Sequence, residues 1–164
     1  MKVSSENYPS FSYFYFLMIL SIFIDDFFFY WIHRILHLKI FYWIHKEHHE
    51  LNILTNLGTV NANCFEYFWA NSFPSVAGLA IFGPKIYNPF IISAYVTYRI
   101  WQAEEQHCGY EFKYSIFKAF PFCASNEYHN YHHDKNNGNY AIFFTFWDHI
   151  FGTNQPYFKL KDKK

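Results

Sequence analysis

The chain has 164 residues, enough for one domain, and its 13 Lys and Arg balance 13 Asp and Glu. A net charge of zero gives no electrostatic basis for binding nucleic acid, so we expect no nucleic-acid partner. Hydrophobic residues make up 52% of the chain and charged residues only 16%, against roughly 25% in ordinary soluble domains, which favours a membrane protein.

The first predicted element is an apolar helix over residues 11–32, about the length of one membrane span. Asp25 and Asp26 interrupt it, and because acids at membrane depth are costly, we expect them to face a protein interior. Basic residues follow, Arg34 and Lys39 first, as expected of a cytoplasmic flank. No small-residue cleavage site follows the run, which favours a retained segment over a signal peptide. A deep core helix of a larger protein would show the same composition.

Nine of the ten histidines occur in three clusters and one isolated position. They are His33 and His37; His45, His48 and His49; His107; and His129, His132 and His133. Positions three and four apart share one helix face, so each cluster predicts a row of imidazoles along a single helical stripe. Neutral imidazole binds several transition metals, and nine ligands exceed what one tetrahedral zinc uses. We therefore expect two metal ions in one site, although any one histidine alone would suit a cap or a satisfied core position.

A second apolar region covers residues 64–101 and is broken near 82–84 and 88–89, where Gly-Pro and Asn-Pro punctuate helices. Histidine clusters lie before and after it, so the chain must return to the side it left. This predicts a helical hairpin in the membrane. Residues 102–156 are richer in Asn, Asp and Lys and predict a helical cytoplasmic cap that holds the dimetal site. The expected fold is a single all-α membrane domain over residues 1–164.

Several other metal and nucleophile chemistries are excluded by missing motifs. Residues 45–47 match the H-x-E half of a zinc deaminase, but no P-C-x-x-C follows. The H-E-x-x-H pattern of zinc proteases is absent, as are G-x-S-x-G, a P-loop and a dinucleotide fingerprint. Cys64, Cys108 and Cys123 form no C-x-x-C pair, which argues against a disulfide scaffold.

Metal-binding histidines normally donate their second N–H to a carboxylate or carbonyl. Asp26 lies seven residues before His33, two turns away on the same helix face, and is the leading candidate for this supporting role. The weaker candidates are Glu66, Glu104, Glu105, Asn139 and Asp148. Asn139 and Asp148 would equally suit a local turn or cap.

Five motifs in order carry a family resemblance. They are D-D-F-F-F-Y-W-I-H-R-I-L-H at 25–37, H-K-E-H-H at 45–49, H-C-G-Y at 107–110, H-N-Y-H-H followed by G-N-Y within 129–140, and W-D-H-I-F-G-T at 147–153. Over about residues 20 to 156, the chain resembles the membrane fatty acid hydroxylase/sterol desaturase superfamily and, within it, the C-4 methylsterol oxidases.

This resemblance implies a membrane diiron oxygenase that oxidises C–H bonds of a lipid. The nine clustered histidines would be the iron ligands, with no catalytic residue beyond them. Dioxygen would be reduced with NAD(P)H-derived electrons, relayed by a b-type cytochrome and its reductase. The expected location is the endoplasmic reticulum membrane, multi-pass, with a cytoplasmic active site. C-4 methyl oxidation in sterol biosynthesis is the first expectation; sterol desaturation and fatty-acyl or sphingolipid hydroxylation are the alternatives.

The chain also departs from the family pattern. Family members are usually longer and carry additional membrane helices upstream, which keeps open a shortened, catalytically silent metal-binding relative. Asn63 aligns where a histidine often stands, so either its side chain or a water would replace a tenth ligand. Tyr128 stands where many relatives have another histidine. His149 varies among relatives and is not expected to be a ligand.

Overall fold

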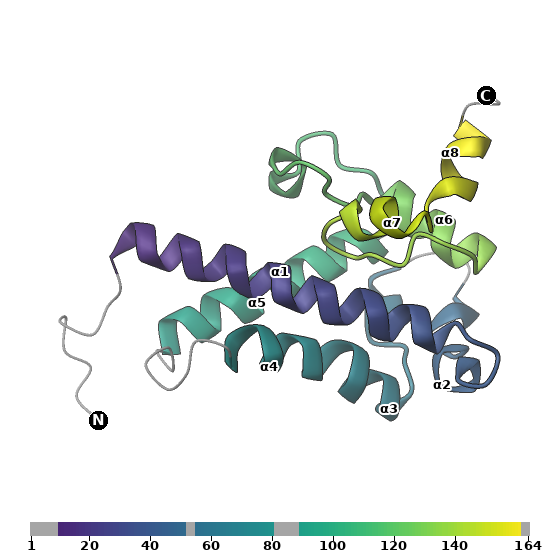
Figure 1. The fold of residues 1–164 in the computed structure, drawn as a ribbon, viewed down its shortest axis with the longest axis horizontal. Coiled ribbons are helices and arrows are strands. Elements are labelled where there is room, and N and C mark those ends of the chain that lie inside the picture. Colours follow the sequence, from purple (N-terminus) through teal and green to yellow (C-terminus); the bar gives the residue numbers. More distant parts are fainter. Residues whose placement is uncertain (1–9, 52–54, 81–88, 162–164) are drawn as a thin grey trace.

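The computed structural model describes residues 10–51, 55–80 and 89–161, and within these ranges it consists of helices and loops without a strand. The predicted all-α fold is confirmed (Figure 1). An isolated β-bridge between Cys123 and Phe144 is the one extended pairing in the described part of the chain. The predicted helix breaks at 82–84 and at Asn88 lie outside the described residues, and Pro89 begins the next helix.

The long helices are separated by short turns of α, 3-10 and π helix. In chain order the elements are α1 (Phe11–Leu36), α2 (Tyr42–His45), η2 (His48–Glu50), η3 (Asn56–Thr59), α3 (Cys64–Glu66), the π-helix η4 (Tyr67–Ser72), α4 (Phe73–Ala80), α5 (Pro89–His107), η6 (Ile116–Ala119), α6 (Asn126–Lys135), α7 (Phe146–Phe151) and α8 (Gln155–Lys161).

The helix α1 is the one element among the described residues that is long and apolar enough to cross a membrane. Ser10 begins it, because its side chain accepts a hydrogen bond from the backbone N–H of Tyr13. The helix continues four residues beyond the predicted end at Ile32 and stops at Leu36. It therefore carries His33 on rigid helical backbone.

Three helical stretches, α1, α4 and α5, lie side by side and form the body of the molecule (Figure 1). The close approach of α1 and α4 requires Gly78, because a Cβ there would lie 2.6 Å from the carbonyl oxygen of Ser21. The main hydrophobic core joins these helices to the segment before α7; it comprises Ile22, Phe29, Leu36, Ala70, Tyr95, Ile142 and Phe143. The stretches 64–80 and 89–107 match the two arms of the predicted hairpin, whose membrane insertion stays a prediction.

Asp25 confirms the expectation that the acids of α1 face the protein interior. Its carboxylate lies 2.8 Å from the Arg99 guanidinium and accepts hydrogen bonds from the hydroxyls of Ser75, at 3.2 Å, and Tyr95. These partners come from α4 and α5. A buried ion pair broken by losing one partner is strongly destabilising, so this network locks the three helices in register.

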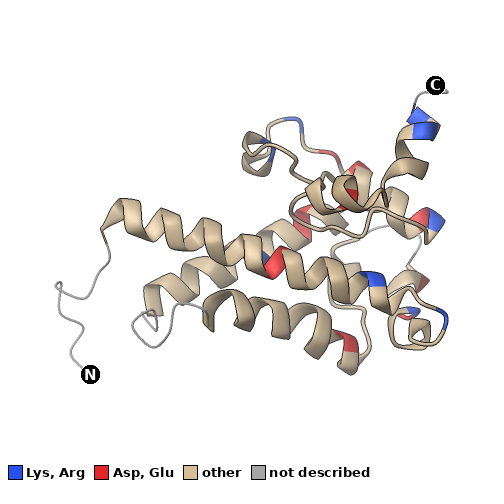
Figure 2. Cartoon of the chain, in the orientation of Figure 1, with Lys and Arg blue, Asp and Glu red and all other residues tan. Residues whose placement is uncertain are grey.

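The segment after α5 folds back along α1 and is not confined to its end. The Trp147 ring packs on Phe27 at 5.1 Å and on Phe23 at 5.4 Å, which lie roughly two and a half and three and a half turns before the end of α1 at Leu36. Figure 2 shows charged residues gathered toward the end that carries α2, α6 and α8, whereas the N-terminal half of α1, all of α4 and the first half of α5 have none. The apolar end suits lipid and the charged end suits water.

Candidate metal centre

The nine clustered histidines all lie at the charged end of the helices. His33 is on α1 and His37 is its C-cap, His45 ends α2, His48 and His49 are on η2, His107 ends α5, and His129, His132 and His133 are on α6. Eight of these nine side chains are buried, and His37 is half-buried. Segments separated by up to about a hundred residues therefore converge on one place, as the spacing predicted.

Their ligand atoms form two groups, and within each group all atoms lie within 4.8 Å of one another. The five-histidine group consists of His33, His37, His45, His49 and His132. The four-histidine group consists of His48, His107, His129 and His133. The nine histidines thus divide into two groups that could each hold a metal ion, and no other such group occurs in the described ranges.

The two H-x-x-H-H clusters are each divided between the groups. From residues 45–49, His45 and His49 join the five-histidine group and His48 joins the other. From residues 129–133, His132 joins the five-histidine group while the other two join the four-histidine group. The prediction of one helical stripe is wrong for residues 45–49, because α2 ends at His45 and a separate 3-10 turn carries the rest.

The imidazoles meet through their Nε2 atoms. In the five-histidine group, Nε2 of His45 lies 3.0 Å from Nε2 of His33 and 3.0 Å from that of His49. In the four-histidine group, Nε2 of His107 lies 2.9 Å from that of His129 and 3.4 Å from that of His48. Each group is thus a cage of inward-facing Nε2 atoms.

Several Nδ1 atoms point outward onto oxygen atoms. His33 Nδ1 lies 2.7 Å from the Tyr140 carbonyl oxygen, and His132 Nδ1 lies 2.7 Å from that of Gly138. In the other group, His107 Nδ1 lies 2.8 Å from the Ala103 carbonyl, and His48 Nδ1 lies 3.3 Å from that of Asn61. Carbonyl oxygens only accept, so these four rings carry their proton on Nδ1 and a lone pair on Nε2.

This tautomer assignment tests whether the site suits a metal. Nε2 of His48 and Nε2 of His107 face each other with two lone pairs and no proton between them. A cation between the lone pairs removes that repulsion, and imidazole nitrogen is a general ligand for transition metals. The donor set therefore fits two transition-metal ions. His49 contributes its Nε2 atom to the five-histidine group, and His133 contributes its Nε2 atom to the four-histidine group.

The environment keeps the histidines neutral, as metal ligands must be. Burial lowers the pKa of His107 to about 4, and burial together with neighbouring histidines lowers that of His49 to about 2. The same causes hold the pKa values of His129 and His132 well below their usual range.

Asp148 and Asp26 both hold the loop between α6 and α7. Asp148 is buried and accepts hydrogen bonds from the backbone N–H groups of Tyr140 and Ala141, at 3.0 and 2.8 Å, and from the hydroxyls of Thr153 and Tyr128. Asp148 thereby fixes the loop whose carbonyls orient His33 and His132.

Asp26 holds the next part of the same loop. Its carboxylate accepts the backbone N–H groups of Phe143, at 2.9 Å, and Phe144, at 3.2 Å. Two glutamine side chains of α5, Gln102 and Gln106, both donate to the carbonyl of Ile142, the residue before Phe143. The hydrogen bonds of Asp26 are therefore with the loop and not with His33, which shares its helix face.

Glu66 is the acidic side chain that touches a clustered histidine. Its Oε1 lies 2.9 Å from Nδ1 of His45, and both side chains are buried. By contrast, Asn139 donates to the Tyr128 carbonyl at 3.0 Å and adopts a positive φ of 54°. It shapes the loop and does not touch a histidine.

Four other residues considered in the sequence, Asn63, His149, Glu104 and Glu105, have neighbours outside the two histidine groups. Asn63 is the N-cap of α3, and its Oδ1 accepts the Phe65 backbone N–H at 3.0 Å. His149 is exposed, belongs to neither group and packs on Phe158. Glu104 and Glu105 contact no histidine in the described structure and line a separate cavity.

Sequence reasoning missed the carbonyl groups that orient the imidazoles and the two glutamines of α5. The G-N-Y motif was the available signal, since its first and last residues supply two of these carbonyls. A backbone oxygen leaves no side-chain signature, so its role could be found only in three dimensions.

The chain is similar to several known proteins. The chain is 34% identical to methylsterol monooxygenase 2-2 of Arabidopsis thaliana over 86% of its length and 53% of that protein's. It is 33% identical to methylsterol monooxygenase 2-1 of the same plant, over 86% and 56%. It is also 33% identical to the very-long-chain aldehyde decarbonylase GL1-8 of Oryza sativa subsp. indica, over 84% and 52%.

The chain thus spans about half the length of the curated relatives it matches. No solved structure gives a significant match. The profile of the fatty acid hydroxylase family matches residues 18–153, which include all nine clustered histidines and both loop-holding carboxylates. On this match, the chain belongs to the fatty acid hydroxylase family.

Proposed function

We propose that this chain forms the metal-binding part of a membrane diiron oxygenase that oxidises C–H bonds of a lipid. The observation that carries the proposal is the pair of Nε2 cages, in which rings protonated on Nδ1 present converging lone pairs. Two bound iron ions would supply the reduction of dioxygen and the oxidation of the C–H bond, using NAD(P)H-derived electrons from a b-type cytochrome and its reductase.

The residues of this chain would bind the two ions and orient the rings that hold them. The nine histidines would hold the ions, and Glu66 would fix the ring of His45 through its Nδ1 atom. A cavity of about 20 Å³ opens beside both groups. Its apolar wall includes Phe29, Ala70 and Ile142, which would exclude water from the reacting centre. Thr59 also lines it, with a buried hydroxyl that has no hydrogen-bond partner in the described structure.

A lipid substrate is supported by the surface that surrounds this centre. Large apolar side chains are exposed along α1, along η4 and along α5; they include Phe16, Ile19, Trp69, Val96 and Ile100. In water such a surface would aggregate, whereas in a bilayer it brings the cage close to lipid. We propose an endoplasmic reticulum location, with α1 and the 64–101 hairpin in the membrane and residues 102–156 toward the cytoplasm.

Among lipid reactions, C-4 methyl oxidation of a sterol is the first candidate, supported by the names of two relatives and by the H-C-G-Y and W-D-H-I-F-G-T motifs. Sterol desaturation and fatty-acyl or sphingolipid hydroxylation are the alternatives, because such enzymes share most of the same histidines. The name of the rice relative widens the range to fatty aldehydes.

The test expresses the chain in membranes and measures bound iron and oxidised lipid separately. With iron, dioxygen, reductant and a 4-methylsterol, we expect about two irons per chain and an oxidised C-4 methyl product. His132→Ala is the inactive control and His149→Ala the active one. Oxidation of fatty acyl chains but not sterols would select the alternative substrate. Full iron loading with no product from any lipid would identify a catalytically silent metal-binding relative.

A further inference from the structure

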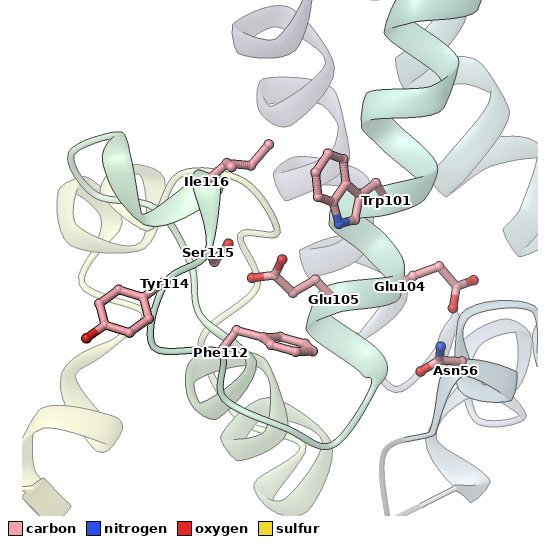
Figure 3. A pocket seen from close by; sticks show the side chains of 8 residues that line it. All are labelled: Asn56, Trp101, Glu104, Glu105, Phe112, Tyr114, Ser115 and Ile116. Carbon is pink, nitrogen blue, oxygen red and sulfur yellow. The ribbon is translucent and has the colours of Figure 1, made fainter.

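A second cavity, of about 330 Å³, lies between the last two turns of α5 and the loop that follows it (Figure 3). Its wall on the α5 side consists of Trp101, Glu104 and Glu105, and its wall on the loop side includes Phe112 and Ile116. In Figure 3 the Glu105 carboxylate points into the space toward the loop, whereas Glu104 points toward Asn56. The cavity lies outside both histidine groups, and the proposed oxidation makes no use of it.

Both carboxylates of this cavity lack a protein cation. Neither Glu104 nor Glu105 forms a side-chain hydrogen bond or ion pair in the part of the chain that the structure describes. Nearby acids differ, since Glu111 pairs with Lys118 and Glu127 with Lys161, at 3.0 Å in the latter. Two consecutive half-buried carboxylates in a hollow therefore leave negative charge for an external cation.

Aromatic rings beside the carboxylates add a second kind of contact for a cation. The faces of Trp and Phe attract ammonium groups, and acids combined with rings recognise quaternary ammonium ligands. Elsewhere in the same loop the Lys113 ammonium lies 5.1 Å from the Tyr114 ring centroid. Trp101 and Phe112 offer two further rings beside Glu105. A cavity of this size admits a trimethylammonium or primary ammonium group and part of its attached chain.

The same loop exposes large apolar side chains and packs on α5. We define the aromatic loop as residues 110–122; its exposed large side chains are Tyr110, Phe112, Tyr114, Ile116, Phe120 and Phe122. Buried Phe117 anchors it against Tyr98, at 5.2 Å, and Trp101, at 5.5 Å, on the helix arm that we place in the membrane. Aromatic side chains with lysines between them are typical of the membrane–water interface. The cavity thus opens at headgroup level.

We propose that this cavity binds the ammonium headgroup of a membrane phospholipid, with Glu105 as the principal anionic contact and Trp101 and Phe112 as the flanking rings. The lipid would dock the aromatic loop on the bilayer one helical turn from His107. This proposal rests on the membrane location in the proposed function and is independent of metal binding and of the oxidation reaction.

The test uses the full chain in detergent, with phosphatidylcholine and phosphatidylglycerol as competing lipids, and counts retained lipids by native mass spectrometry. We expect the parent protein to retain phosphatidylcholine in preference. Glu105→Gln should lower that retention on the order of tenfold, and Trp101→Leu should lower it by a smaller factor. Glu127→Gln, a matched charge removal outside the cavity, should leave it unchanged.

Iron content is measured on the same samples, so that a folding defect or a failure of the metal proposal is seen separately from lipid loss. Equal retention of the two lipids by the parent, or unchanged phosphatidylcholine retention in Glu105→Gln with iron content intact, would overturn the proposal. If free choline binds the parent protein and phosphatidylcholine does not, the cavity binds a soluble ammonium compound. That result would overturn the proposal of a lipid headgroup.

Discussion

The two histidine groups are built from the same residue type but are held in place differently. In the five-histidine group, His33 and His132 donate to carbonyls of the loop between α6 and α7. In the four-histidine group, His107 donates to Ala103, one turn earlier on its own helix. His48 of the same group donates to the Asn61 carbonyl. In the described structure, Nδ1 has no hydrogen-bond partner in His129 and His133 of this group or in His45 and His49 of the other.

This difference teaches that the loop between α6 and α7 orients rings of one group, whereas the other group is oriented by Ala103 on α5 and by Asn61. The loop that orients His33 and His132 is fixed by Asp148 and Asp26, so damage there should reach the five-histidine group first. The described rings of the four-histidine group donate to Ala103 and Asn61 and not to this loop, so that group should tolerate loop damage. The expected result is unequal loss of two ions.

Acid should cause the largest effect and should remove the distinction between the groups. An unfolded histidine takes up a proton below about pH 6.5, whereas burial lowers the pKa of folded His107 to about 4 and of His49 to about 2. The unfolded state therefore binds more protons below pH 6.5. As the pH is lowered, the free energy of unfolding decreases by roughly 1.4 kcal/mol per pH unit for each such histidine. Thermal unfolding of the metal-stripped chain from pH 7.5 to 5 measures this. A flat melting temperature would contradict it.

Removing one ligand should separate the groups most clearly. His132→Ala takes away an Nε2 donor of the five-histidine group, and we expect loss of about one iron per chain while the other is retained. His149→Ala should keep both, because His149 is exposed and outside both groups. Elemental analysis of the two variants provides the comparison. Equal loss from both would show that the ligands are sorted incorrectly.

Asp148→Asn tests the loop directly. Asp148 accepts four hydrogen bonds, and the amide nitrogen of Asn cannot accept, so the Tyr140 and Gly138 carbonyls lose their fixed position. We expect metal affinity of the five-histidine group to fall about 10- to 100-fold with the second iron retained. Asp134→Asn, an exposed acid on α6, is the control. Parallel loss of both irons would show that the two groups are not held independently.

Asp26→Asn should have a similar but smaller effect. Asp26 accepts two backbone N–H groups of the loop, and Asn leaves one of them unpaired. Insertion should be kept, while iron retention falls by on the order of tenfold. Membrane fractionation and an iron titration measure the two quantities. Unchanged iron content would reject a supporting role for Asp26.

Asn63→Ala should lower the stability of the protein without changing its iron content. Asn63 caps α3 through the Phe65 backbone N–H, and loss of such a cap costs about 0.5–2 kcal/mol. We expect a modest fall in melting temperature and full iron content in both groups. Loss of one iron would instead support Asn63 as a substitute for the tenth ligand of the family.

Much of the site was readable from residue types and spacing. Imidazoles three and four residues apart predicted convergence, and the structure brings all nine together. The buried acids of α1 were also predicted, because a charge in an apolar helix needs a partner. The partner of Asp26 was not predicted, since helical spacing reports only neighbours on one helix and the loop at 143–144 lies 117 residues away.

The sequence by itself determined the helical class and the nine clustered imidazoles, and it predicted more than one metal. It did so because ligand chemistry and helical periodicity are properties of residue type and local spacing. Tertiary structure alone decided which histidines form each group and which carbonyls orient them. The adjacent rings His48 and His49 enter different groups, as His132 and His133 on α6 also do, because neighbouring side chains in a helical turn point in different directions and meet different partners in the fold. Backbone carbonyls act through position and carry no residue code.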